Sequence, residues 1–192
     1  IGCRDTIVRY NLSVNDGLRA TGKHAGFSPT FHISGNVTGT RIYHNTVIVP
    51  AKRGPETDRS LVKMDNWGGK WPEGTRFSNN LVFAEEQLRF IAGKAVGTTF
   101  DGNTLVGDFA GLPDGVGTIP GERMFAYQAD GAGSLLPQLW RDRQGAARCF
   151  AIGGSGSFPP PVQPVRGDVG LDFTGAPVRP PLLPGAVQRP GG

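Results

Sequence analysis

The chain has 192 residues and a formal net charge of +4, which is enough length for one domain with a sizeable core. Only 38% of its residues are hydrophobic, while 30 are glycine and 16 are proline, a composition that argues against an amphipathic helical protein. No apolar run reaches the roughly 18 residues of a membrane-spanning helix, and the aromatic residues are not interleaved with basic ones as in nucleic-acid-binding proteins.

An asparagine recurs in the middle of four strand-like segments. Asparagine is depleted from strands and favoured where a chain bends, so each segment indicates two short strands joined by a corner. Repetition within roughly 20–50 residues is typical of a solenoid, although four unrelated strand–turn pieces of a β-sandwich remain an alternative. The segments are VRYNLSV at 8–14, IYHNTVI at 42–48, FSNNLVF at 77–83 and FDGNTLV at 100–106, which align Asn11, Asn45, Asn80 and Asn103.

A shorter alternating segment lies between the corners: FHISGN at 31–36, LVKMDN at 61–66 and LRFIAGK at 88–94. Each is predicted to be a strand closed by Gly, Asn or Lys. One coil would then consist of a strand, a turn, a second strand, the asparagine corner and a third strand. The polar segments 15–30 and 50–60 are predicted to be loops that leave this stack.

The two ends of the chain differ from its middle. We expect solenoid coils over 1–110, an irregular segment packed on the last coil over 111–152, and a Pro/Gly-rich tail with a short closing strand over 153–192. Because the chain begins at Ile1, almost directly before a strand-like segment and without a recognisable cap, we expect a processed chain or a fragment whose earlier coils are missing or lie on another chain.

The two cysteines, Cys3 and Cys149, do not have the spacing of a zinc site. In a secreted protein, a Cys3–Cys149 disulfide would tie the C-terminal part to the first coil. Two buried free thiols are the alternative.

The segments VRYNLSVNDG, FHISGN, RIYHNTVIV and FSNNLVFA together resemble the right-handed parallel β-helix proteins with the pectate-lyase-type fold. The C-terminal LDFTGAPVRPPLLPGAVQR is similar to the ending of many secreted bacterial members of that group. The resemblance covers about 5–107 and 168–189. It implies an all-β, right-handed parallel β-helix solenoid of about three to four coils with an irregular C-terminal extension, and a secreted or cell-surface location.

The resemblance also assigns a role to the four asparagines. In such proteins, stacked asparagines line a sharp corner between the second and third strands of each coil. Neighbouring coils lie about 4.8 Å apart, so each side-chain amide can hydrogen-bond to the next. We therefore expect Asn11, Asn45, Asn80 and Asn103 to be structural and to tolerate the left-handed backbone conformation of the corner.

The resemblance further implies that a substrate lies along the first strand of each coil. Alternation turns Phe31, Ile33, Val62, Met64, Leu88 and Phe90 inward. It leaves His32, Ser34, Lys63, Asp65 and Arg89 outward, and stacking would align His32, Lys63 and Arg89 as a basic stripe. A slip of one residue in the middle strand would turn Lys63 inward, and a solvated charged face is the alternative interpretation of the stripe.

A basic stripe suits an acidic polysaccharide, because a uronate carboxylate must be neutralised before its α-proton is removed. We expect Lys63 as the base, with Arg89 and His32 as further catalytic candidates, and Lys23, His24, Ser34 and Asp65 as substrate-binding residues. Lyases of this fold usually combine Lys or Arg with calcium held by several carboxylates. Here carboxylates are sparse, so Asp16 and Asp65 are only weak candidates for a calcium site.

Two functions therefore remain open. The first is a secreted, lyase-like β-helix protein that binds or cleaves an acidic polysaccharide. The second is a non-catalytic β-helix module for binding or surface display, or the structural half of a larger processed protein. Fold alone does not decide between them, because this fold carries several unrelated activities.

Overall fold

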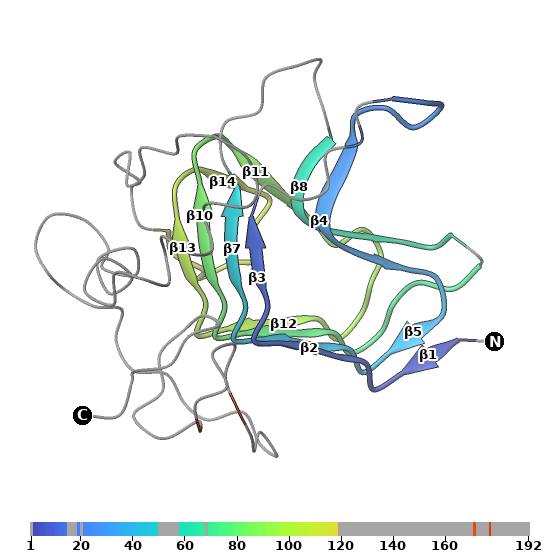
Figure 1. The fold of residues 1–192 in the computed structure, drawn as a ribbon. Helices are drawn as coiled ribbons and strands as arrows, with labels where there is room; N and C mark the ends of the chain where they lie inside the picture. The colour runs from blue at the N-terminus through green and yellow to red at the C-terminus, as the bar shows by residue number, and fades with distance from the viewer. Residues whose placement is uncertain are drawn as a thin grey trace, which may run out of the picture.

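The computed structural model describes residues 2–14, 19, 21–49, 58–67, 69–118, 171 and 177. In this part of the chain the structure is all-β, and three four-stranded sheets contain most of the strands (Figure 1). A two-stranded sheet joins β1 (Cys3–Arg4) to β5 (Val37–Thr38). No helix in the described part is long and apolar enough to cross a membrane.

Each large sheet takes one strand from successive passes of the chain, and we name each sheet by its first strand. The β2 sheet contains β2 (Ile7–Arg9), β6 (Arg41–Tyr43), β9 (Arg76–Ser78) and β12 (Thr99–Asp101). The β3 sheet contains β3 (Leu12–Val14), β7 (Thr46–Val49), β10 (Leu81–Ala84) and β13 (Thr104–Val106). The β4 sheet contains β4 (Phe27–Ser34), β8 (Asp58–Asp65), β11 (Leu88–Ile91) and β14 (Phe109–Ala110).

The pairing between these strands is parallel throughout. Parallel neighbours need a crossover connection, and here the crossover is the rest of a coil. The predicted parallel β-solenoid is therefore confirmed at the level of strand arrangement, and the β-sandwich alternative is wrong. The expected segments 111–152 and 153–192 lie outside the described residues, apart from 111–118, 171 and 177.

Two predicted loops end earlier than expected. Segment 15–30 was predicted to be a loop, but β4 begins at Phe27 and includes Pro29. Proline lacks the backbone donor of a central strand, yet β4 lies at one edge of its sheet, where proline is tolerated. Likewise, β8 begins at Asp58, inside the predicted loop 50–60.

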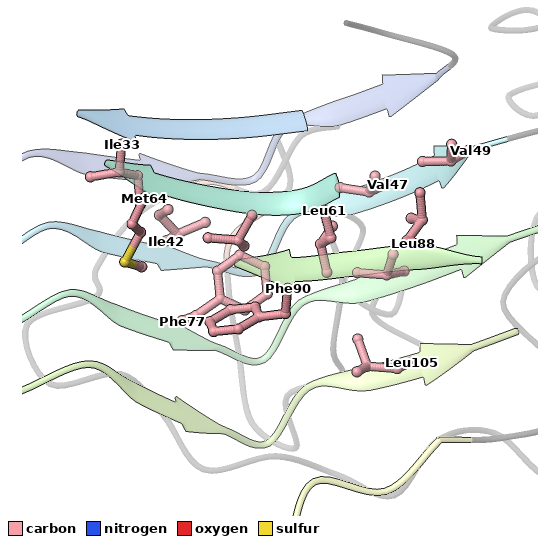
Figure 2. Close-up of a cluster of buried hydrophobic side chains, with 12 residues drawn as sticks. Ile33, Ile42, Val47, Val49, Leu61, Met64, Phe77, Leu88, Phe90 and Leu105 are labelled. Atoms are coloured by element: carbon pink, nitrogen blue, oxygen red, sulfur yellow. The ribbon is translucent and has the colours of Figure 1, made fainter. Parts of the chain in front are cut away.

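The three sheets enclose a hydrophobic core between them. Figure 2 shows side chains from all three sheets pointing toward one another, among them Ile42, Val47 and Leu88. The ring of Phe77 stacks on Phe100 at 4.9 Å between ring centroids. The residues predicted to point inward from the first strands all contact this core. Phe31 packs against it and is partly buried. The other five are buried core residues, namely Ile33, Val62, Met64, Leu88 and Phe90.

The four corner asparagines form a hydrogen-bonded ladder. The backbone N and side-chain Nδ2 of Asn11 both donate to Oδ1 of Asn45, at 3.0 and 2.8 Å. Asn45 donates in the same way to Asn80, at 3.0 and 2.9 Å. Asn80 donates to Asn103, at 2.9 and 2.8 Å. Each rung thus joins two coils through a side chain, in addition to the strand pairing.

The left-handed backbone conformation lies one residue earlier than predicted. It falls on Tyr10, His44 and Asn79, with φ of 52°, 51° and 54°, and not on the asparagines of the ladder. The fourth corner has Gly102 at this position, with φ 62°, where a residue without Cβ is unstrained. The first corner residue therefore makes the bend, and the second makes the ladder.

Candidate functional site

The outward face of the β4 sheet carries the side chains expected to contact a substrate. Because Ile33, Met64 and Phe90 are buried in the core, their neighbours along each strand point away from it. His32 and Arg89 are exposed. The other members of this set are half-buried, namely Ser34, Lys63 and Asp65.

The expected stripe is not straight. His32 pairs in register with Lys63, as predicted, but the residue beside Lys63 on β11 is Ile91. Arg89 pairs instead with Ser60, so its predicted alignment with Lys63 is wrong.

A β-bulge explains the shift. Arg89 pairs with Ser60 whereas Phe90 pairs with Val62, so β8 contains one extra residue, Leu61. The side chain of Leu61 is fully buried in the core. Leu61 and Val62 both enter the core, so Arg89 is displaced along the face relative to His32 and Lys63.

Asp65 connects two side chains of the preceding coil. Its Oδ2 lies 2.7 Å from Nε2 of His32, and its Oδ1 accepts a hydrogen bond from the hydroxyl of Ser34. The backbone N of Trp67 also donates to Oδ1, at 3.2 Å. These contacts hold the Asp65 carboxylate of β8 against the side chains of the neighbouring strand β4.

Burial alone would raise the pKa of Asp65, but other interactions outweigh it. Hydrogen bonds from Ser34, His32 and the backbone of Trp67, together with the charge of His32, hold the pKa of Asp65 below its ordinary value of 3.8. The ionised carboxylate can only accept hydrogen bonds, so the proton on this side of the ring belongs to Nε2 of His32.

Ser34, Asp65 and His32 do not form a nucleophilic triad. In such a triad the histidine bridges the serine and the acid, so that it can take the proton of the hydroxyl. Here Asp65 is the bridging group and Ser34 donates to it. The arrangement orients a histidine and leaves the serine without a base.

Two aromatic residues belong to this face although the sequence did not single them out. Nζ of Lys63 lies 4.9 Å from the ring centroid of Phe27, and that ring meets His32 edge-on at 5.1 Å. Trp67 follows β8 and is 77% exposed. The only sequence signal for Trp67 was a large aromatic residue in a glycine-rich turn just after Asp65.

Two of the remaining predicted ligands lie next to this face, where the backbone N of Phe27 donates to the carbonyl oxygen of His24 at 3.1 Å. Lys23 and His24 lie in the exposed turn before β4, closed by a hydrogen bond from Ala25 N to Gly22 O at 3.0 Å. Asp16 lies outside the described residues, and so does Cys149, the expected partner of the exposed Cys3.

Among the described residues, the surroundings of Asp65 do not fit a calcium site. Both Asp65 oxygens already accept hydrogen bonds, whereas calcium takes six to eight oxygen ligands. Across the described ranges, no group of three or more His, Cys, Asp or Glu side chains could hold a metal ion. Glu86, a further carboxylate near this face, forms an ion pair with Arg59.

A scan against family models gave no match for this chain, and searches of curated proteins and of solved structures gave none either.

Proposed function

We propose that this protein binds an acidic polysaccharide along the outward face of the β4 sheet. The observation that carries the proposal is the register pairing of His32 with Lys63, with Arg89 exposed on the same face. Strands about 4.8 Å apart place such side chains at spacings that a linear polyanion can follow. The exposed ring of Trp67 adds a flat surface on which a sugar can rest.

A second candidate is cleavage of that polysaccharide by β-elimination. The contact between His32 Nε2 and Asp65 favours it, because a histidine oriented by a carboxylate through one ring nitrogen can act as a general base through the other. Nδ1 would take the proton next to the uronate carboxylate, and Lys63 would neutralise that carboxylate. A double bond would form in the sugar ring as the glycosidic C–O bond breaks, and the departing oxygen would take a proton from water. In this scheme His32, and not Lys63 as expected from the sequence, is the base, because Lys63 lies over the Phe27 ring.

The proposal includes kinship with the secreted, right-handed pectate-lyase-type β-helices, with about three to four coils and an irregular C-terminal extension. Its support is the asparagine ladder between the second and third strands of successive passes. The competing account is a non-catalytic β-helix module, or the structural half of a larger protein. Such a module would have the same fold but would not cleave the polysaccharide.

Binding of polygalacturonate and of alginate at low and high salt tests the proposal. At low salt, Lys63→Ala and His32→Ala should each weaken binding about threefold to tenfold. Lys94→Ala, a matched change in the exposed turn after β11, should not. Salt should weaken binding to the wild type, since screening acts over about 8–10 Å. Salt-independent binding, or none, would refute the proposal.

The absorbance of unsaturated sugar products separates the two candidates. If the chain is a lyase, His32→Ala should lower turnover by about 10²–10⁴-fold, far more than it lowers binding. Salt-dependent binding without any unsaturated product would establish the non-catalytic module instead.

A further inference from the structure

A second cationic feature lies on the β2 sheet. Arg41 of β6 and Arg76 of β9 are direct register neighbours. Their strand neighbours Ile42 and Phe77 are each only 1% exposed and belong to the core. Alternation therefore turns both arginine side chains outward, onto a different sheet from the proposed polysaccharide site.

Like charges directly opposite each other on neighbouring strands are destabilising. Compensation is missing at this position: in the described part of the chain, neither guanidinium group forms an ion pair or a hydrogen bond. The flanking strands place Ile7 beside Arg41 and Thr99 beside Arg76, so the register row contains no acid.

The other charged groups on this face do not relieve the pair. Arg9 of β2 lies one pleat further along, opposite Tyr43, and its Nη1 donates to the Tyr43 hydroxyl at 3.4 Å. Asp101 lies opposite Ser78, two residues beyond the row of Arg76, and forms no ion pair with it. Within the described residues, the two positive charges therefore lie side by side without a counter-charge.

We propose that Arg41 and Arg76 form a binding site for a doubly charged oxyanion, namely a phosphate group. Guanidinium groups match the oxygens of such an anion with paired N–H donors. A phosphate monoester carries about −1.5 to −2 charges at neutral pH, so one group balances both arginines. A carboxylate supplies one charge and leaves the pair half compensated. The proposal does not rest on the polysaccharide site.

Thermal unfolding with and without anions tests this site in the intact chain. Inorganic phosphate and glucose 6-phosphate, compared with acetate at matched ionic strength, should raise the unfolding midpoint of the wild type by about 2–6 °C. The two phosphate compounds distinguish the free ion from a phosphorylated sugar. Arg76→Gln and Arg41→Gln should each abolish the gain, while Lys94→Gln, in the exposed turn after β11, should retain it.

The same variants report on the repulsion without any ligand. At low ionic strength and without phosphate, Arg76→Gln should unfold at the wild-type midpoint or above it, because a like-charge contact is removed. An equal phosphate gain in wild type and in both glutamine variants would overturn the proposal. A gain with acetate as large as the gain with phosphate would overturn it as well.

Discussion

Replacing Asn45 by alanine tests the ladder at a buried asparagine. Asn45 is 1% exposed, and its Nδ2 contacts the carbonyl oxygens of Val8 and Tyr43, at 3.0 and 3.1 Å, and Oδ1 of Asn80 at 2.9 Å. Its Oδ1 accepts two hydrogen bonds from Asn11. Alanine keeps the backbone donor to Asn80 and removes all of these side-chain interactions.

The expected cost follows from which partners remain buried. In surroundings closed to water, the Tyr43 carbonyl loses its side-chain donor and Asn80 Oδ1 keeps only the backbone donor of residue 45, whereas Asn11 is exposed and can turn to solvent. An unsatisfied buried polar group costs about 1–3 kcal/mol, so Asn45→Ala should lower the free energy of unfolding by about 2–3 kcal/mol. In a chain of this size, that corresponds to a fall of about 4–12 °C in the unfolding midpoint.

Asn11→Ala is the matched control, because the same residue type lies at the exposed end of the same ladder. It loses only the Nδ2 contacts to the Arg9 carbonyl and to Asn45, which water can replace in part, so its cost should stay below about 1 kcal/mol. Urea unfolding followed by circular dichroism measures both variants. Equal costs for Asn11→Ala and Asn45→Ala, or no cost for the latter, would refute the proposed contribution of the ladder.

Three further predictions concern the core, a corner and the carboxylate. Ile42→Ala should cost about 2–5 kcal/mol in urea unfolding, since it leaves a cavity at a core position that is 1% exposed; a neutral result would contradict the register of β6. Gly102→Asn should leave the free energy of unfolding nearly unchanged, because Asn79 occupies the equivalent corner position. Gly102→Val should lower it by about 1–2 kcal/mol, and similar melting midpoints for the two variants would contradict this. Because folding lowers the pKa of Asp65, its contribution to stability is present above the ordinary value of 3.8 and is lost as the pH falls below it. The wild-type midpoint should therefore fall faster than that of Asp65→Asn in acid, and parallel curves would argue against this.

The corner pattern could be predicted because it is local. An asparagine flanked by apolar β-formers is unusual in a strand, and its recurrence aligned Asn11, Asn45, Asn80 and Asn103 before their hydrogen bonds were known. Alternation likewise identified most residues of the first strands that enter the core, although it placed Leu61 outward.

The incorrect predictions concern features that depend on packing between neighbouring coils. The bulge at Leu61 arises because two successive apolar residues are both buried in the core. In the sequence, the only sign of this bulge was the pair Leu61–Val62, which interrupts the alternation of apolar and polar residues. The left-handed residue at each corner could not be identified from composition, since four different residue types occupy this position and a tyrosine such as Tyr10 is uncommon there. Phe27 was assigned to a loop because Pro29 hides the start of an edge strand.

Chemical-shift mapping of the wild-type chain with polygalacturonate oligomers tests the central functional claim most directly. The account predicts salt-sensitive shifts at His32, Lys63 and the indole of Trp67, which Lys63→Ala should weaken and Lys94→Ala should leave unchanged. Shifts confined to the β2 sheet, or no shifts at any salt concentration, would contradict binding of an acidic polysaccharide along the β4 sheet.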